Sequence, residues 1–388
     1  MTSSPGKKRL RVLFFESGRR GGSIFQLRSI LHHLDPDRFE SGFVSWYSDK
    51  AAAVLFELPK PFCRHSLRLR FEQPDTVKHL FGVPIPTPFA AYYRLFSERV
   101  IVRERPDVVY MNTGIGGHGP AIVAASRRGV PVVCHFRHSR DLNADERRLA
   151  GRVTHFVASS RWGARHLGRQ LDRPAADVTC AYESIDLRAF DERAERERGP
   201  ALAAGPLYVC LVGSLIPRKR PLLAIEGFAR ACRTNPRLRL VIAGDGPLRA
   251  QVERSVAAAG LDSFVLRLGS VSTVPALLRG GHVGLLASEA EGMPNAVMEY
   301  MAAGLPVVTA AIPGVDELVA PGRTGLIVSE PITPDTIAEA LTAVTADDTR
   351  RAEMGRAGRR TIESPAFRPG TAAAAVADVV ERAVGPRG

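Results

Sequence analysis

The chain has 388 residues, of which 45% are apolar and 24% are charged, and its formal net charge is +13. This length exceeds what one ordinary hydrophobic core organises, so we expect two domains, and the sequence has no run of about 20 apolar residues that could span a membrane. Five scattered cysteines lack the spacing of a metal site or a disulfide framework, which predicts reduced thiols in a cytoplasmic protein.

In the first half, short apolar runs alternate with helical stretches, which predicts parallel strands in α/β layers. The run nearest the N-terminus, Val12–Phe15, is short and is typical of a first strand rather than of a signal peptide. The expected strands of this half are Leu10–Phe15, Ser41–Trp46, Asp107–Asn112, Val130–Phe136, Thr154–Ser159 and Asp177–Tyr182.

The first expected strand leads into a glycine-rich turn, ESGRRGGS, over residues 16–23. Gly21 and Gly22 would let a donor substrate approach the backbone closely. The turn lacks the G-x-G-x-x-G pattern of dinucleotide sites, so a turn that binds no ligand remains the alternative.

The stretch from Lys60 to Arg105 combines arginines with aromatic residues, and Phe89, Tyr92 and Phe96 recur at helical spacing. One interpretation is a helix face in the core of the first domain. The other is a surface that docks on an anionic membrane, at the inner face of the cell membrane, or that holds a large acceptor.

The net positive charge of the chain does not decide between these interpretations, because a general preference for arginine over lysine also explains this charge. Spread-out basic residues argue against nucleic-acid binding.

Polar residues follow two buried strands of the first half. Asn112 and His118 come after one, and His135, Arg137 and His138 end or follow the next. We expect Asn112, His118 and His135 to contact an acceptor, and His138 and Arg137 to act on the donor sugar or a phosphate. A single histidine is more often structural, which is the alternative for each.

The second half again alternates strands with helices. Its expected strands are Leu207–Gly213, Arg237–Gly244, Phe264–Leu268, Val283–Ala287, Pro306–Ala310 and Gly325–Val328. A charged and then Gly/Pro/Ala-rich segment separates the halves, which predicts a first Rossmann-like domain over 1–190, a linker over 191–206 and a second domain over 207–365. The tail, 366–388, is expected to form a helix that crosses back to the first domain. Two such domains would face a central cleft.

A basic loop, GSLIPRKR, follows the first strand of the second half. Gly213, Ser214, Arg218 and Lys219 are candidates to contact a diphosphate, and Lys219 is the only lysine after Lys78. A solvated basic loop is the alternative, but a point charge on a flexible stem suits a phosphate in a chain that otherwise uses arginine. Gly244, in the turn after the next strand, is a second candidate.

The segment EAEGMPNAVMEYMAAGLP, residues 289–306, has a strand before it and predicts a helix from Pro294–Asn295 to about Ala303. The free backbone N–H groups at such a helix start bind anions, phosphate above all. Glu291 and Glu299 beside this start suit hydroxyl groups of a sugar or ribose rather than the phosphate itself.

These pieces together resemble the retaining family 4 glycosyltransferases of the GT-B fold. The specific part of the resemblance is Gly213 to Lys219, AGDGP at 243–247, SEAEGMPNA at 288–296, EYMAAGLP at 299–306, and GVDE at 314–317 with GRTG at 322–325. The first half matches only through Gly21-Gly22 and the strands beginning at Pro106 and Pro131.

The resemblance implies transfer of a sugar, with retention and without a metal or cofactor, from a UDP- or GDP-type nucleotide sugar. The acceptor hydroxyl would belong to a saccharide, a lipid-linked acceptor or a small molecule. Glu291 would bind the donor sugar, Glu299 the ribose, and Lys219 with a neighbouring arginine the diphosphate. The backbone contacts to the diphosphate would come from Gly292, Met293, Pro294, Asn295, Ala296 and Val297.

The sequence departs from the family pattern at several positions. Ser214 stands where the family often has Arg, Arg137 where it has His, Glu183-Ser184 where it has Asn-Gly, and Ala287 where it has Pro. The alternatives to a transferase are a sugar-nucleotide epimerase or hydrolase on the same fold, and a non-catalytic subunit that binds the donor.

Overall fold

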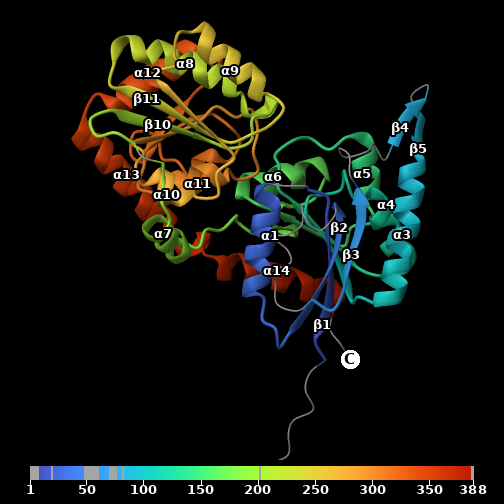
Figure 1. Ribbon diagram of the computed structural model, residues 1–388. Coiled ribbons are helices and arrows are strands. Elements are labelled where there is room, and N and C mark those ends of the chain that lie inside the picture. The colour runs from blue at the N-terminus through green and yellow to red at the C-terminus, as the bar shows by residue number, and fades with distance from the viewer. Residues whose placement is uncertain are drawn as a thin grey trace, which may run out of the picture. The chain divides into compact units, whose positions relative to one another are not determined.

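The computed structural model describes residues 8–18, 21–47, 61–69, 77–80, 83–200 and 202–385. The chain divides into two compact units, of which unit 1 comprises the chain up to Ser184 with the segment from Pro369, and unit 2 comprises Ile185–Arg368. Each unit is built on a parallel sheet with helices beside it, as in a Rossmann fold (Figure 1). The predicted fold class, two Rossmann-like domains, is therefore confirmed.

Within the described residues, unit 1 has a seven-stranded sheet in the order β3-β2-β1-β6-β7-β8-β9, and its neighbouring strands all pair in parallel. The strands are β1 (Leu10–Glu16), β2 (Phe39–Tyr47), β3 (Arg64–Leu69), β6 (Val108–Met111), β7 (Val132–Phe136), β8 (His155–Ala158) and β9 (Val178–Cys180). All strands predicted for this half are present. The edge strand β3 was not predicted, because RHSLRL forms no apolar run.

Helices and a small hairpin complete unit 1. The helices are α1 (Gly22–His33), α3 (Pro88–Glu104), α4 (Gly119–Arg127), α5 (Ala144–Ala150), α6 (Arg161–Gln170) and α14 (Pro369–Val384), with a short 3₁₀ turn, η1 (Ala175–Asp177). The hairpin pairs β4 (Val77–Leu80) with β5 (Val83–Pro86) in antiparallel fashion. The C-terminal helix α14 lies against α1, so the chain's last helix belongs to unit 1 (Figure 1).

Both faces of the unit 1 sheet are buried, as in parallel sheets generally. Along β1, Leu13 and Phe15 join one hydrophobic cluster, whereas Val12 and Phe14 join the cluster that includes α14. This alternation follows from the two-residue period of a strand. Burial on both faces explains why β1 appears in the sequence as a continuous apolar run.

The predicted helix face of the basic, aromatic stretch is only partly correct. Phe89, Phe96 and Val100 of α3 pack against the core of unit 1, but Tyr92 is 53% exposed and the neighbouring Tyr93 is fully buried in its place. Core packing thus accounts for most of this face. Lys60 and the residues at 70–76 and 81–82 lie outside the described residues. No described helix is long and apolar enough to cross a bilayer.

Unit 2 contains, among the described residues, a six-stranded sheet in the order β12-β11-β10-β13-β14-β15, again with parallel pairing throughout. The strands are β10 (Leu207–Val212), β11 (Leu238–Ala243), β12 (Val265–Gly269), β13 (Val283–Leu286), β14 (Val307–Ala310) and β15 (Gly325–Val328), all of which were predicted. The helices are α7 (Leu187–Arg196), α8 (Pro221–Thr234), α9 (Arg249–Ala258), α10 (Val274–Leu278), α11 (Asn295–Ala302), α12 (Pro334–Thr345) and α13 (Asp348–Ile362). Three short 3₁₀ turns are η2 (Pro217–Lys219), η3 (Val315–Glu317) and η4 (Pro365–Phe367).

The predicted linker over 191–206 begins inside a helix. Its first residues form the end of α7, where ion pairs join Arg188 to Glu192 and Arg193 to Glu197 at helical spacing. Asp191 also binds Arg359 of α13 over 2.7 Å. The alternating charges, taken as a sign of a linker, are instead the i,i+4 pairs that support a helix.

Helix α13 packs very closely on the end of α11, and a glycine permits it. A Cβ atom added at Gly355 would lie 1.9 Å from the carbonyl oxygen of Gly304, so the two backbone segments would have to move apart. We expect Gly355→Ala to lower the free energy of unfolding by about 2 kcal/mol, the usual cost of overpacking.

Chemical denaturation of the full chain measures this effect. Gly370→Ala is the matched control, because a Cβ at this helical position meets nothing within 4 Å. The control should be neutral or slightly stabilising, since alanine favours helices more than glycine does. Equal stability of the two variants would contradict the expected clash.

Candidate functional site

The strand order of unit 2 places two loops of interest side by side. The order reverses between β10 and β13, which are direct neighbours although more than 70 residues separate them. Ligands in open α/β sheets bind at such switch points, beyond the carboxyl ends of the strands. The basic loop after β10 and the acidic loop after β13 therefore meet at one edge of the sheet.

Ion pairs join these two loops through Glu291. Its Oε1 contacts the Nζ atom of Lys219, and its Oε2 lies 2.9 Å from Nη1 of Arg218. The backbone adds a further link, since the amide of Glu289 donates to the carbonyl of Arg218 over 2.8 Å. One carboxylate thus holds two cations, and the three groups together keep a net positive charge.

The environment keeps Glu291 ionised. Burial alone would raise the pKa of this carboxyl, but the adjacent Lys219 and Arg218 outweigh burial and lower the pKa. Glu291 is only 9% exposed. A buried carboxylate between two cations is stable at neutral pH and can exchange these partners for other hydrogen-bonding groups.

The start of α11 offers backbone donors beside this ion pair. The helix begins at Asn295 after Pro294, close to the predicted start, and it ends at Ala302. Within the part of the chain that is described, the amides of Gly292, Met293 and Ala296 have no acceptor. Free N–H groups at a helix start attract anions, so this end of α11 and the two cations form one anion-binding arrangement.

Glu299 lies one turn further along α11 and differs from Glu291. No described residue forms an ion pair or hydrogen bond with its carboxylate. Burial raises its pKa to about 7, with Lys219 and Arg193 acting against the rise. Two carboxyls on neighbouring segments therefore have different proton affinities, and their separate roles remain predictions.

The raised pKa of Glu299 predicts a stability change with pH. Between its ordinary value of 4.5 and about 7 the folded chain keeps this proton while the unfolded chain releases it. The stability that this group contributes is therefore complete below pH 4.5 and decreases by about 3 kcal/mol as the pH rises to about 7. Glu299→Gln should remove this part of the pH dependence.

Denaturant unfolding of the wild type and the variant across this pH range tests the expectation. The difference between the two proteins is the readout, because other groups titrate equally in both. A difference that stays constant with pH would contradict it. Glu289→Gln, a change at an exposed neighbouring acid, serves as the control.

Two glycines lie in the turns that follow β10 and β11, next to the basic loop of this site. Gly213 has φ 143°, a conformation that favours glycine, directly after β10. A Cβ at Gly244 would lie 1.8 Å from the carbonyl oxygen of Gly213, so Gly244 lets the loops after β10 and β11 touch through backbone alone. Ser214 lies in the same turn. The proposed contacts of Gly213, Ser214 and Gly244 with a nucleotide remain predictions.

A buried ion pair lies at the strand ends of unit 1. Nη1 of Arg137 donates to Oε2 of Glu183 over 2.6 Å, and both side chains are at most 6% exposed. Nη2 and Nε of Arg137 donate to Oδ1 of Asn112 over 2.8 and 3.0 Å. Asn112 in turn donates to Glu16 at the end of β1. Arg137 thus binds protein acceptors in this structure, and its predicted contact with a phosphate remains a prediction.

The same network continues to His135. Ser159 donates to Oε1 of Glu183 over 2.8 Å, so its oxygen is left to accept from Nε2 of His135 at 3.3 Å. The other ring nitrogen, Nδ1, lies 2.8 Å from the hydroxyl of Tyr110. Burial lowers the pKa of His135 well below its ordinary value, and Arg137 adds to the effect. The ring is therefore neutral and fixed in one tautomer.

His118 has a similar interior position. Its Nδ1 lies 3.1 Å from the hydroxyl of Tyr93 and its Nε2 lies 3.0 Å from Oγ1 of Thr113. Burial lowers its pKa to about 3. His118, His135 and Asn112 are all fully buried in this structure, and their predicted contacts with an acceptor remain predictions.

The remaining predicted residues of unit 1 lie nearer the surface. His138 is partly exposed and packs edge-on over Phe136, with ring centroids 5.7 Å apart. Gly21 has φ 128° and precedes α1, which starts at Gly22. These positions leave the predicted donor contacts of Gly21, Gly22 and His138 as predictions.

Sequence reasoning missed Glu16, Ser159 and Glu183. Glu16 ends the first strand and the other two follow later strands. The signal was present, because polar side chains at the carboxyl ends of parallel strands meet at one sheet edge. Which of them meet depends on the strand order, and the sequence does not supply that order.

One group of potential metal ligands occurs among the described residues: Cys63, His65 and Glu104, whose ligand atoms lie within 4.8 Å of one another. Nε2 of His65 already lies 2.9 Å from Glu104, and Arg103 and Arg11 lie 3.3 and 3.9 Å from the same carboxylate. Cations of the chain thus compensate this carboxylate, and the site plays no part in the chemistry proposed below.

Comparison with known proteins places the specific match in unit 2. Residues 192–361 match the model of the family described as glycosyl transferases group 1. The alpha-D-kanosaminyltransferase of Streptomyces kanamyceticus is 28% identical over 253 residues, which cover 58% of this chain and 64% of that protein. The matches to the first relatives span between about half and two thirds of those proteins' own lengths.

Solved structures show the same fold over nearly the whole chain. HepE of Anabaena, solved in complex with UDP, superposes with a TM-score of 0.74 at 19% identity and covers 96% of this chain and 99% of its own. A putative UDP-N-acetylglucosamine 2-epimerase of Listeria monocytogenes reaches a TM-score of 0.68 at 14% identity, with 96% of each chain covered. At these identities the likeness concerns the fold.

Proposed function

We propose that this chain, whose residues 192–361 match the family of group 1 glycosyl transferases, transfers a sugar from a nucleotide-diphosphate sugar to a hydroxyl acceptor. The observation that supports this proposal is the meeting of Lys219, Arg218 and Glu291 beside the start of α11. Two cations and free amides suit a diphosphate, and a carboxylate suits sugar hydroxyls. A nucleotide sugar has both groups next to each other.

The proposed reaction uses these groups in the following way. The bond between the anomeric carbon and the diphosphate oxygen breaks, and its electron pair leaves with the diphosphate. Lys219, Arg218 and the amides of Gly292, Met293 and Ala296 stabilise the developing charge, so cations of the chain do the work that a metal ion does elsewhere.

We propose retention by front-face attack. The acceptor oxygen bonds to the anomeric carbon on the face that the diphosphate leaves, and its proton passes to the departing phosphate oxygen. Glu291 holds the donor sugar through its hydroxyls, and Glu299 binds the ribose. The donor is of UDP or GDP type, and the acceptor is a saccharide, a lipid-linked molecule or a small hydroxyl compound.

Thermal unfolding with a panel of nucleoside diphosphates and nucleotide sugars identifies the donor. Calorimetric titration of that donor into Glu299→Ala then tests the site, and at least a tenfold loss of affinity is expected, about 1.4 kcal/mol. Glu289→Ala, on an exposed side chain of the adjoining loop, is the matched control. Unchanged affinity in Glu299→Ala would contradict the assignment of the ribose site.

An epimerase or hydrolase of sugar nucleotides is the second candidate, because the Listeria epimerase shares the fold. Incubation with the donor alone separates the candidates. A transferase should leave most of the donor intact until an acceptor is added, whereas an epimerase yields the epimer and a hydrolase yields free sugar. Donor binding without any turnover over a panel of acceptors would favour a non-catalytic donor-binding subunit.

A further inference from the structure

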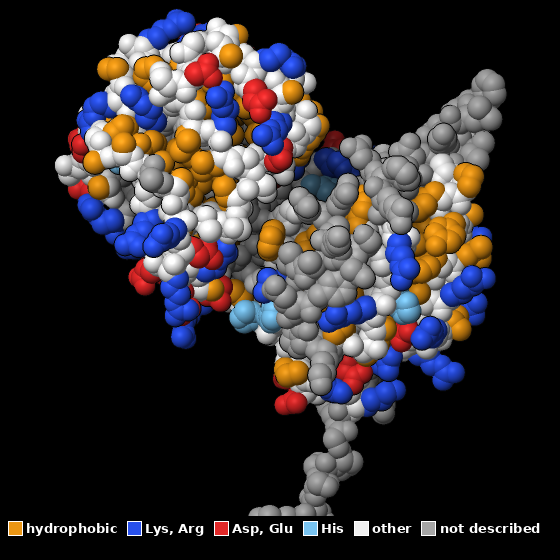
Figure 2. Space-filling view, in the orientation of Figure 1, with side chains coloured by type: hydrophobic (Ala, Val, Ile, Leu, Met, Phe, Trp, Pro, Cys, Tyr) orange, Lys and Arg blue, Asp and Glu red, His pale blue; other side chains and the backbone are white. Residues whose placement is uncertain are grey.

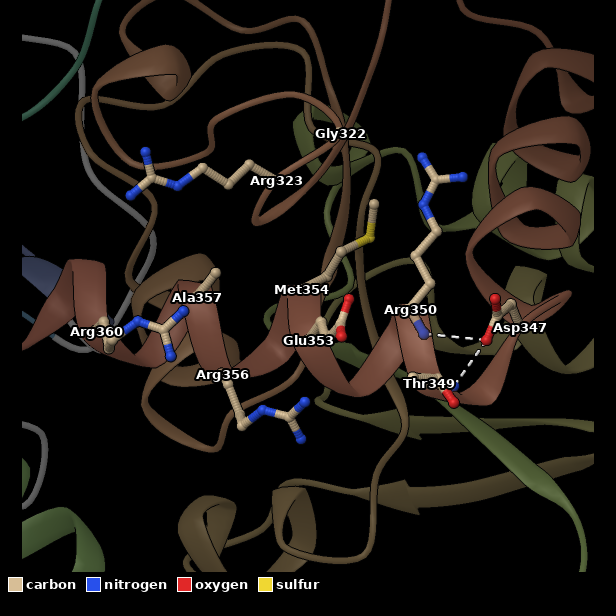
Figure 3. A pocket seen from close by; sticks show the side chains of 10 residues that line it. All are labelled: Gly322, Arg323, Asp347, Thr349, Arg350, Glu353, Met354, Arg356, Ala357 and Arg360. Carbon is tan, nitrogen blue, oxygen red and sulfur yellow. Dashed lines mark hydrogen bonds between the residues drawn. The ribbon is translucent and has the colours of Figure 1, made fainter.

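A shallow depression of about 780 Å³ lies on unit 2, and Lys219, Arg218 and Glu291 are not among the residues that line it. Residues of the turn before β15 and one side of α13 line it, as Figure 3 shows. Four arginines belong to this lining: Arg323 from the turn, and Arg350, Arg356 and Arg360 from α13. All four are exposed. We name these four residues the arginine patch.

The arginines of the patch differ from the other arginines of α13. Arg351 pairs with Asp348 over 2.5 Å, and Arg359 binds Asp191 over 2.7 Å and Glu363 over 3.0 Å. None of the four patch guanidiniums forms an ion pair with a described residue. Within the described residues, the helix thus has paired arginines, of which Arg359 joins α13 to α7, and exposed arginines that form no ion pair.

Two acids in the same lining do not neutralise the patch. Oδ1 of Asp347 accepts the backbone amides of Thr349 and Arg350 over 2.8 and 3.0 Å, so this carboxylate caps α13 (Figure 3). Glu353 is exposed and forms no ion pair within the described part of the chain. The four arginines of the lining outnumber its two acids, so the depression keeps an excess of positive charge.

The arrangement of the four side chains indicates what kind of anion they suit. Figure 3 shows the four guanidiniums separated from one another along α13 and the turn, without converging on one point. From Arg350 to Arg360 the helix advances by about 15 Å. A single phosphate needs converging donors, so this spacing suits several separate anionic groups at one surface. The lining has no aromatic side chain on which a nucleobase could stack.

We propose that the arginine patch docks unit 2 on an anionic lipid bilayer, with each guanidinium contacting headgroup phosphates. The attraction of basic residues to such a surface raises binding roughly fivefold for each residue, and it decreases with salt. Four residues acting together should raise partitioning at least 100-fold. This docking is independent of the proposed transferase reaction, because it requires neither donor nor acceptor.

Sedimentation of the full chain with vesicles tests the proposal. Vesicles of phosphatidylcholine mixed with phosphatidylglycerol are compared with vesicles of phosphatidylcholine alone, at low and high salt. The test variant combines Arg323→Gln, Arg350→Gln, Arg356→Gln and Arg360→Gln. The control combines Arg196→Gln, Arg198→Gln, Arg233→Gln and Arg254→Gln, which remove the same charge at exposed arginines elsewhere in unit 2.

The expected result is salt-sensitive binding of the wild type and the control to the anionic vesicles, with at least a 100-fold loss in the test variant. Equal binding of the two variants would overturn the proposal, because net charge alone would then explain the attraction. Preferential binding of the patch to soluble polyphosphate, with none to vesicles, would overturn the lipid assignment. Thermal unfolding verifies that both variants fold. If the combined variant does not fold, the four single replacements are tested instead, and each should lower binding to the anionic vesicles severalfold.

Discussion

Replacement of Glu291 by Gln is expected to tighten the binding of a nucleoside diphosphate about tenfold and to lower the rate of sugar transfer at least about 100-fold. In the structure Glu291 neutralises part of the charge of Lys219 and Arg218. A diphosphate must compete with this carboxylate for the same two cations. Glutamine has nearly the same shape but no charge, so the competition disappears.

The loss of transfer has a different cause. The hydroxyl groups of a nucleotide sugar can donate hydrogen bonds to the displaced carboxylate of Glu291, and these bonds replace its lost ion pairs. The diphosphate product has no sugar hydroxyls and offers no such replacement. Glutamine holds these hydroxyls less strongly and less well oriented, and a small misplacement of the sugar is costly for the rate.

Calorimetry with UDP and GDP and a transfer assay with the identified donor measure the two effects. Glu289→Gln is the matched control, because it removes the same charge two residues away on an exposed side chain that forms no ion pair within the described residues. The control should leave both quantities within about twofold. Loss of transfer with unchanged affinity for the diphosphate would show that Glu291 does not compete for the cations.

Arg137→Met is expected to lower the free energy of unfolding of unit 1 by about 3–5 kcal/mol. Among the described residues, Arg137 is the only cation that forms an ion pair with the buried carboxylate of Glu183, and it also holds Asn112, which binds Glu16. Removing one partner of a buried pair leaves the other charge without compensation in a region of low dielectric constant. Burial already raises the pKa of Glu16.

Hydrogen exchange localises this effect. Amides of β7 in unit 1 should exchange faster in Arg137→Met, while amides of β10 in unit 2 keep their protection, because the units are separately compact. The double variant Arg137→Met with Glu183→Gln should recover part of the loss, since it removes both charges. Arg188→Met provides the control: its pair with Glu192 is exposed and contributes only about 0.3–0.5 kcal/mol. A loss in Arg137→Met as small as in this control would contradict the role of the buried pair.

Much of the fold followed from apolar runs in the sequence. Strands such as Leu10–Phe15 are buried on both faces, so they appear as unbroken hydrophobic stretches bounded by turns. The edge strand β3 was missed because four of the six residues in its sequence, RHSLRL, are polar and interrupt any apolar run. Residues 191–196 were assigned to a linker because charge alternation was interpreted without its helical spacing.

The candidate site could be predicted where local sequence determines it. The helix start near Asn295 followed from Pro294 and the glycine before it, and Lys219 stood out as an isolated lysine. The direct contact between Lys219 and Glu291 depends on the adjacency of β10 and β13. The positions of Arg137 and His135 could not be predicted for the same reason, since their partners come from strands that only the folded sheet brings together.

The ion pairs of Glu291 have a consequence for how the site responds to its surroundings. Most cationic phosphate sites hold loosely associated anions from solution, which are released when a phosphate arrives, and the affinity then falls steeply with salt. Here the carboxylate is a counter-ion that the chain carries with it, fixed by a buried contact. The arriving diphosphate displaces a carboxylate that belongs to the chain, so no anion is released to solution. The affinity of the site for the diphosphate should therefore change little between dilute and concentrated salt.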